Sequence, residues 1–352
     1  MFLAWNEIKR NKLRFILIIG VLMLVAYLVF FLSGLANGLK NMNREAVDKW
    51  NADAIILTAE SDKNLPQSNF MKTDLNDINA DEQANLTVLS AIAGKGDDKK
   101  NVFVFGIEQD SFIMPNITEG KKYQEKNEVI ASDALKNDGF KLGDKIQLSS
   151  TDVHLKIVGF TDIARFSAAP VLYGDISEVN KIKINEETNE SLNAIIIKDS
   201  DSKNIEVSDK FEVIEIETFI QKLPGYSEQN LTLTFMIYFL FVISAVIIAI
   251  FLYVLTVQKI SMFGIMKAQG ISNSYLAKSV VAQTFILASV GVVVGFVLAI
   301  LTGMGIPDAV PVSFDISTMI IYGVILILTA ILGAIFSVFT IVRIDPLEAI
   351  GG

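Results

Sequence analysis

The sequence predicts a multi-pass membrane protein with four transmembrane α-helices and an α+β extracytoplasmic domain inserted between the first and the second helix. Three observations support this fold class. Hydrophobic residues make up 51% of the chain and its mean hydropathy is +0.46, which is typical of a membrane protein. Four long runs contain no charged residue. The charges lie between these runs, because residues 40–230 carry 22 basic and 34 acidic side chains, against 8 and 5 in the rest of the chain.

Composition excludes several kinds of functional site. The chain has no cysteine, which rules out disulfides, thiolate zinc sites, iron–sulfur clusters and cysteine nucleophiles. His154 is the single histidine, so a histidine-built metal site or catalytic triad is not expected. The negative charge of the region between the runs leaves no basic surface for nucleic acid, and no nucleic-acid partner is expected.

The first predicted span covers residues 15–35. Its 21 uncharged residues extend about 30 Å as a helix, which matches the hydrocarbon core of a bilayer. A cleavable signal peptide has an apolar core of only about 7–15 residues, so a retained helix is predicted. Residues 1–14 mix Trp5 and other apolar side chains with four basic residues, as in an amphipathic cytoplasmic segment, although an ordinary basic flank would have the same composition.

Three more spans are predicted towards the C-terminus, at residues 231–257, 279–301 and 316–342. Basic residues gather in the N-terminal segment and in the loop 258–278, so the positive-inside rule places both in the cytoplasm. The tail 343–352 is then cytoplasmic as well. Residues 36–230 and the outer loop 302–315 are predicted to be extracytoplasmic.

Residues 51–215 predict a compact α+β domain. Short runs rich in β-branched and aromatic residues, bounded by turn residues, indicate strands. The predicted strands are Ala54–Thr58, Thr87–Ala93, Val102–Ile107, Glu128–Ala131, Lys145–Leu148, Val153–Phe160, Pro170–Tyr173, Ala194–Ile197 and Phe211–Ile216. Short helices are predicted at Asp133–Asn137 and Asp175–Asn180.

Stalk helices are predicted on both flanks of this domain. Residues 36–50 and 216–230 are compatible with helix and continue the first and second spans outward, although plain linkers would fit the same residues. Pro224 and Gly225 should break the second stalk just above the membrane, because proline cannot donate a backbone hydrogen bond and glycine tolerates unusual backbone angles. We expect these two residues to form a joint.

The sequence lacks the motifs by which a chain would energise transport itself. It contains no Walker pattern for nucleotide binding, and no cluster of acidic residues or histidines lies inside a predicted span. The chain is therefore not expected to be an enzyme or a proton-coupled carrier. Any active transport must draw its energy from a partner chain.

The loop 258–278 carries the most specific motif. A short helix ending at Gly270 and a second helix start at Ser272–Asn273 predict a docking surface for a partner protein. We expect Phe263, Ile265 and Met266 to face that partner, while the loop's lysines, Lys259, Lys267 and Lys278, lie at the anionic membrane face.

This segment resembles the coupling segment of FtsX/MacB-like ABC transporter permeases, in which a G-I-x-K-A-x-G core packs against the ATPase subunit. The coupling residues implied by this resemblance are Phe263, Gly264, Ile265, Met266, Lys267, Ala268 and Gly270. The C-terminal Asp345–Ile350 is similar to the closing D-P-x-E-A motif of the same family. The order of one span, an outer domain and three spans also matches.

Within the family, the chain looks most like the haem-exporting permeases of Gram-positive bacteria. The stretches that carry this likeness are Phe31–Leu39, Tyr253–Gly270 and Asp345–Gly352. The resemblance implies a homodimer of the mechanotransmission kind in the cell membrane, driven by two cytoplasmic ATPase subunits that hold ATP and magnesium. Haem would be a transported ligand, taken from the membrane lipid and released outward, and no intrinsic cofactor is expected.

A haem pocket in the outer leaflet would need aromatic walls and an oxygen or sulfur ligand. The outer ends of the first two spans supply such side chains: Tyr27, Phe30, Phe31, Tyr226, Glu228, Phe235, Met236 and Tyr238. Among them Tyr27, Met236 and Glu228 could be the axial ligand, whereas an aromatic anchoring belt would use similar residues. His154 lies in an alternating strand pattern and is expected to face solvent.

Other interpretations remain open at this stage. A permease of the same family could move a lipid, a lipopeptide or an antimicrobial peptide. An FtsX-like protein could instead transmit ATPase motion to an outer cell-wall hydrolase, with nothing crossing the membrane. Gly34-x-x-x-Gly38 and Gly291-x-x-x-Gly295 fit small-residue helix packing, either between two copies or within one chain.

Overall fold

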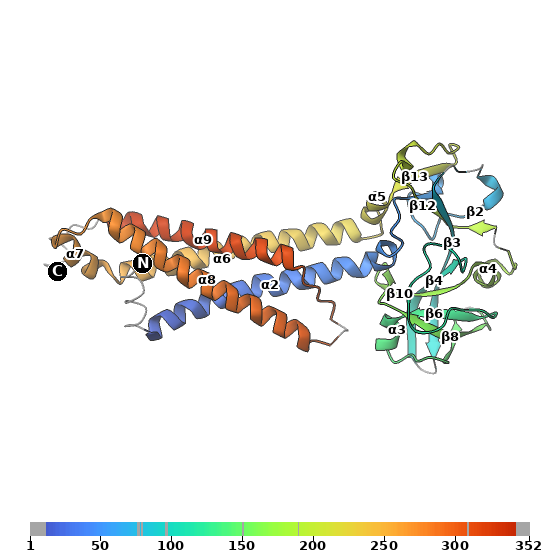
Figure 1. Ribbon diagram of the computed structural model, residues 1–352, viewed down its shortest axis with the longest axis horizontal. Coiled ribbons are helices and arrows are strands. Elements are labelled where there is room, and N and C mark those ends of the chain that lie inside the picture. Colours follow the sequence, from blue (N-terminus) through green and yellow to red (C-terminus); the bar gives the residue numbers. More distant parts are fainter. Residues whose placement is uncertain are drawn as a thin grey trace. The chain divides into compact units, whose positions relative to one another are not determined.

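The computed structural model describes residues 12–342 apart from 76, 77, 79, 96, 97, 150, 189, 308 and 309 (Figure 1). The predicted N-terminal segment 1–14, except for its last three residues, and the cytoplasmic tail 343–352 with its Asp345–Ile350 motif therefore lie outside the described residues. The chain divides into two compact units. The helical unit comprises residues up to Gly38 and from Leu231 onward, and the outer unit comprises Leu39–Asn230.

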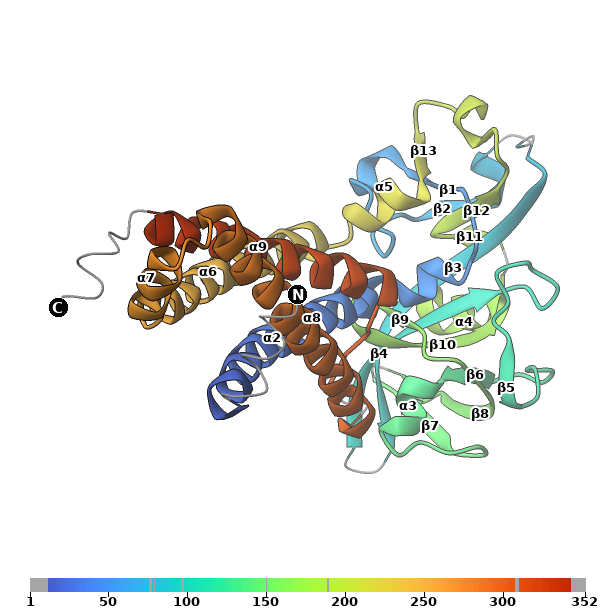
Figure 2. The ribbon, with the colours of Figure 1, turned by 60° about the vertical axis from the view of Figure 1, so that its left-hand side comes forward.

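Four long helices form the helical unit and lie alongside one another in both views (Figures 1 and 2). They are α2 (Lys12–Asp48), α6 (Tyr226–Val257), α8 (Asn273–Gly305) and α9 (Ile316–Val342), and the short α7 (Ile260–Ala268) connects α6 to α8. Each of the four is long and apolar enough to cross a membrane. The predicted four-helix membrane fold with an inserted domain is confirmed. The helices α2 and α6 also extend into the outer unit, and α8 begins six residues before the predicted 279.

Small residues set the packing between α2 and α8. A Cβ atom added at Gly291 would lie 2.7 Å from the Cβ of Leu22, and one added at Gly295 would lie 2.8 Å from the carbonyl oxygen of Met23. Backbones that approach this closely exclude any larger residue. Gly291-x-x-x-Gly295 is thus an intrachain packing motif.

The other glycine pair holds the connection between α8 and α9. A Cβ at Gly34 would overlap the ring of Phe314, and one at Gly38 would overlap the backbone of Pro311. The Ser313 amide donates to the Gly34 carbonyl at 3.0 Å, and the Asn37 side chain donates to the Ser313 carbonyl at 3.2 Å. Gly34-x-x-x-Gly38 therefore fastens this connection onto α2 within one chain.

A mixed sheet forms the centre of the outer unit, with strand order β13-β1-β12-β3-β4-β10-β6-β8-β5 (Figure 2). Most pairs are antiparallel, whereas β10 runs parallel to β4 and β6 runs parallel to β8. The strands are β1 (Ala54–Thr58), β2 (Phe70–Met71), β3 (Glu82–Lys95), β4 (Asp98–Ile107), β5 (Ile117–Gly120), β6 (Glu128–Ser132), β7 (Lys145–Leu148), β8 (His154–Thr161), β9 (Arg165–Phe166), β10 (Ala169–Asp175), β11 (Ser191–Leu192), β12 (Ala194–Lys198) and β13 (Phe211–Glu215). Its helices are α3 (Asp133–Asn137), α4 (Ile176–Ile184) and α5 (Ile216–Gln221), with 3₁₀ turns at Ala59–Ser61, Lys72–Asp74 and Ser202–Asn204.

All nine predicted strands are present, and most are longer in the structure than in the prediction. The strands that the sequence did not reveal are β2, β5, β9 and β11, of two to four residues each. Runs this short show no periodicity, and their position depends on tertiary pairing. The predicted stalk 216–230 is helical on both sides of a break, because α5 ends at Gln221 and α6 begins at Tyr226.

The core of the outer unit includes the ends of both stalk segments. Trp50, which follows α2, is buried and its ring centroid lies 6.0 Å from that of Phe105 on β4. Tyr226, the first residue of α6, is buried in the same cluster with Phe219 of α5. Burial of these large rings anchors the adjoining turns of α2 and α6 to the sheet.

Candidate functional site

A joint separates α5 from α6 in the outer unit. Lys222 is the C-cap residue of α5, and Gly225 has a φ of +75°, a left-handed conformation that favours glycine. The amide of Tyr226 donates to the carbonyl of Leu223 at 3.0 Å and starts the next helix. The predicted break at Pro224 and Gly225 therefore occurs at these residues.

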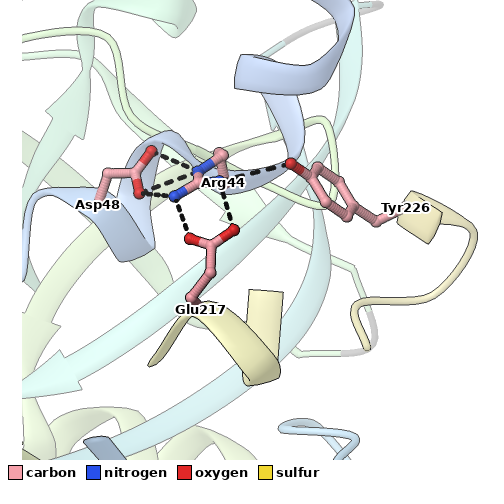
Figure 3. Close-up of polar contacts among 4 residues, drawn as sticks. All are labelled: Arg44, Asp48, Glu217 and Tyr226. Atoms are coloured by element: carbon pink, nitrogen blue, oxygen red, sulfur yellow. Dashed lines mark hydrogen bonds and ion pairs between the residues drawn. The ribbon is translucent and has the colours of Figure 1, made fainter. Parts of the chain in front are cut away.

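Arg44 of α2 connects the two sides of this joint (Figure 3). Its Nη2 atom donates to Glu217 at 2.8 Å, before the joint, and its Nη1 atom lies 3.5 Å from the hydroxyl of Tyr226, after the joint. Its Nε atom donates to Asp48, one turn further along α2, at 2.9 Å. We call Arg44, Asp48, Glu217 and Tyr226 the Arg44 clasp. A planar guanidinium has enough donors in one plane to serve all three partners.

Further polar contacts hold the same part of α2. Asn43 donates from its side-chain amide to Gln229 of α6 at 3.0 Å, and Arg165 of β9 pairs with Glu45 at 3.3 Å. The amides of Ser167 and Ala168 donate to carbonyls of α2 at 3.1 and 3.2 Å. The last turns of α2 are thus joined to α5, α6 and the β9–β10 turn within the outer unit.

The coupling segment of the helical unit has the predicted helix–turn–helix form. The Gly270 amide donates to the Lys267 carbonyl at 2.9 Å, and the Ile271 amide donates to the Met266 carbonyl at 3.0 Å. With Gly270 at a φ of +86°, this is a Schellman motif that ends α7. The Ser272 side chain then accepts from the Tyr275 amide at 3.3 Å and caps the start of α8.

The structure corrects the face of α7 that is available to a partner. Phe263 is only 4% exposed and packs against Leu276 of α8, with the partly buried Met266 beside it. Ile265 is 49% exposed, as predicted, and Met262 on the same face is 40% exposed. The predicted exposure of Phe263 is wrong, whereas Met266 is partly buried, because α7 spans little more than two turns and is mostly apolar, so its sequence does not fix the helix phase.

The other predicted coupling residues also differ in their exposure. Gly264 is buried and Lys267 is partly buried, whereas Ala268 and Gly270 are exposed. The predicted position of Lys259 at the membrane surface is wrong, because its side chain is buried, at 7% exposed, and lies at the bend between α6 and α7.

The outer part of α2 carries two of the predicted pocket residues together. Tyr27 and Phe31 stack with their ring centroids 5.8 Å apart and an interplanar angle of 14°, and both are partly buried. The Tyr27 hydroxyl donates to Thr302 of α8 at 3.4 Å. Phe30, in contrast, is fully buried and makes an edge-to-face contact with Phe296 at 5.8 Å, so protein atoms already cover its ring.

The α6 candidates are exposed on the helical unit. The exposed fractions of Phe235 and Tyr238 are 53% and 62%, and Met236 is also exposed. Tyr226 and Glu228 belong to the outer unit, where Tyr226 is buried and Glu228 is exposed. A further aromatic pair that the sequence analysis did not name is Phe241 and Tyr322, whose ring centroids lie 5.1 Å apart in an edge-to-face arrangement. In the sequence, Tyr322 stands out only as the single tyrosine of the last apolar run.

The described residues contain no group of three or more histidine, aspartate or glutamate side chains that could hold a metal ion. His154 is exposed on β8, where its Nδ1 atom lies 3.0 Å from the Asp152 carbonyl oxygen. Its predicted solvent-facing position is confirmed.

Comparison with known families matches residues 234–346 to the C-terminal domain of FtsX-like permeases. This range includes α7, α8 and most of α6 and α9. The chain is therefore an ABC transporter permease with an FtsX-like C-terminal part, a transport component that works with an ATPase partner. As expected, it is a multi-pass protein of the cell membrane.

The relatives span the whole chain. A protein named as a putative hemin transport system permease protein HrtB, from Staphylococcus epidermidis, is 28% identical over 100% of this chain and 99% of its own. A protein of the same name from Staphylococcus haemolyticus is 26% identical with the same coverage. An uncharacterized ABC transporter permease of Mycobacterium tuberculosis is 22% identical, again over 100% and 99% of the two chains. The predicted resemblance and the expected Gram-positive context agree with the staphylococcal relatives.

Proposed function

We propose that this chain is the permease subunit of an ABC transporter that exports haem from the membrane to the outside. The full-length similarity to permeases named for hemin transport is the observation that carries this proposal. The paired rings of Tyr27 and Phe31 supply a second, physical argument. Haem is a flat apolar macrocycle with two carboxylates, and it partitions into a bilayer from which a lateral aromatic pocket could take it.

The pocket would be built from side chains that protein atoms do not already cover. Tyr27 and Phe31 offer ring faces on α2, and Phe235, Met236 and Tyr238 are exposed on α6. Tyr27 or Met236 would supply an oxygen or sulfur axial ligand. Phe30 would support the walls from within the core of the helical unit.

Energy would come from two cytoplasmic ATPase subunits that bind ATP and magnesium, one on each permease of a homodimer. The exposed face of α7 around Met262 and Ile265 would dock the ATPase. Displacement of α7 would move the helices and change access to the pocket.

Titration of the detergent-purified chain, co-expressed with its ATPase, with haemin tests this proposal. We expect a saturable shift of the Soret band. The haemin affinity obtained from this titration should fall at least fivefold in the Tyr27→Leu and Tyr238→Leu variants. Tyr253→Leu is the matched control, because Tyr253 is a similarly exposed tyrosine of α6, fifteen residues away.

A featureless titration would refute haem as the substrate. Stimulation of the ATPase by a lipid or peptide would then identify a permease for that class. A haem-independent ATPase whose activity controls a cell-wall hydrolase would identify an FtsX-like regulator instead.

A further inference from the structure

The bend between α6 and α7 contains a buried lysine that the coupling motif does not explain. Lys259 is 7% exposed and occupies the N-cap position of α7, with its carbonyl accepting from the Phe263 amide at 2.9 Å. An ionisable side chain buried within a membrane bundle is costly and needs specific partners. Such residues therefore mark functional positions more often than exposed lysines do.

The Lys259 amine reaches two other helices. Its Nζ atom donates to the side-chain oxygen of Gln283 on α8 at 3.0 Å and lies 5.6 Å from the ring centroid of Phe15 on α2. Both partners are buried, at 6% and 2% exposed. Gln283 is ten residues inside α8, or about 15 Å from the helix start, and the buried amine is directed into the helical bundle.

A second contact one turn earlier reaches α9. The hydroxyl of Thr256 on α6 lies within hydrogen-bonding distance of the hydroxyl of Ser337, which also lies 3.3 Å from the Leu252 carbonyl. Thr256 and Ser337 are both buried. The junction of α6 and α7 is thus joined by hydrogen bonds to α8 and α9 and by a cation–π contact to α2. The adjoining cavity, lined by Phe15, Thr256, Lys259 and Gln283 among others, has a volume of only about 20 Å³, so these side chains are closely packed.

We infer that Lys259 is a positioning residue that locks the α6–α7 bend to α2 and α8. A helix bend without such a lock would absorb a displacement of α7 by flexing. With the amine held by Gln283 and Phe15, the same displacement moves α2 and α8 together with α6. The lysine acts through its neighbours Gln283 and Phe15.

A distance measurement between spin labels tests the lock without reference to any substrate. The chain has no cysteine, so labels can be placed at Ile265→Cys on α7 and Leu13→Cys on α2, both exposed positions. In the detergent-purified chain without the ATPase, so that a label on the docking face is harmless, we expect a narrow distance distribution with Lys259. Lys259→Met, which keeps the length of the side chain but not its donors, should at least double the width of the distance distribution. Lys259→Arg should stay narrow, because it retains donors and a planar cation over Phe15.

Gln283→Leu should broaden the distribution in the same way, and Lys278→Met is the matched control at an exposed lysine of α8. An unchanged distribution in both Lys259→Met and Gln283→Leu would overturn the inference. A broad distribution in the Lys278→Met control would overturn it too, because the effect would not be specific to the buried amine.

Transport supplies a second readout, which rests on the proposed function. Lys259→Met should lower haem export at least tenfold while ATP turnover of the assembled complex stays within twofold, and Lys259→Arg should restore export. Equal losses of assembly, turnover and export would indicate a merely structural role and overturn the inference. If the parent complex exports no haem but the distance results hold, the proposed substrate fails and the lock stands.

Discussion

Removal of the Arg44 clasp should lower the free energy of unfolding of the outer unit by a measurable amount. Arg44→Met keeps the aliphatic stem and removes every donor to Asp48, Glu217 and Tyr226. The side chains of Arg44, Asp48 and Glu217 are 23%, 45% and 56% exposed, so each ion pair is partly screened by water. We expect the free energy of unfolding to fall by about 1 kcal/mol through loss of the pair with Glu217 and by about 0.5 kcal/mol through loss of the i,i+4 pair with Asp48. Loss of the contact with Tyr226 should lower it by less.

A double-mutant cycle isolates the contact across the joint. Arg44→Met, Glu217→Gln and the double variant are unfolded in detergent, and the interaction energy of the pair is the non-additive part of the three changes. Trp50 reports on the outer unit because it is 1% exposed within its core, and Trp5→Phe in every protein removes the second tryptophan. An outer unit of this size should lose about 2–4 °C of melting temperature per kcal/mol.

An interaction energy below about 0.3 kcal/mol would refute the clasp as a link between α2 and α5. The same energy should fall when the salt concentration is raised to about 1 M, because screening acts on partly exposed pairs. An interaction energy independent of salt would point to packing of the arginine stem instead of ion pairing.

Three further outcomes are expected. Gly295→Leu should force α2 and α8 apart and lower the free energy of unfolding of the helical unit by about 3 kcal/mol. Gly305→Leu, with open space around it, should change this free energy little, and equal effects of the two substitutions would contradict the close packing. Ile265→Asp should reduce co-purification of the ATPase at least tenfold, with Met304→Asp at the other end of the unit as control, and retained co-purification would move the docking face elsewhere. Burial lowers the pKa of Lys183 from 10.5 to about 8, so the unfolded chain keeps a proton that the folded chain releases between these values, and stability should rise by about 1 kcal/mol from pH 8 to 10. Lys183→Met should abolish that rise, and a rise that survives in this variant would assign it to another group.

The sequence predicted the membrane helices well because a charge-free run of more than 20 residues has few other structures open to it. Helix ends were less predictable. The helix α8 begins at Asn273, with the exposed Lys278 inside it, because a lysine on the surface of a helix can extend towards water. A rule that ends a span at the first charge therefore places the boundary too late.

Contacts between distant segments could not be predicted from one sequence. Arg44 and Glu217 are 173 residues apart, and nothing in the surrounding residues marks either as a partner of the other. The pattern Gly291-x-x-x-Gly295 indicated close helix packing but not the partner, which the structure identifies as α2. Lys259 was misassigned for a related reason, since its burial depends on Gln283 and Phe15 from two other helices.

The division of the chain into two units limits how motion can pass between them. The backbone crosses from one unit to the other at two places, Gly38–Leu39 within α2 and Asn230–Leu231 within α6. Both crossings lie inside helices that contribute residues to both units. The outer unit holds these same two helices through Arg44, and the lock at Lys259 connects them again at the other end. A displacement of α7 that reaches the outer unit through the backbone must therefore travel along α2 and α6, and cutting either the clasp or the lock should separate ATP turnover from movement of the outer unit.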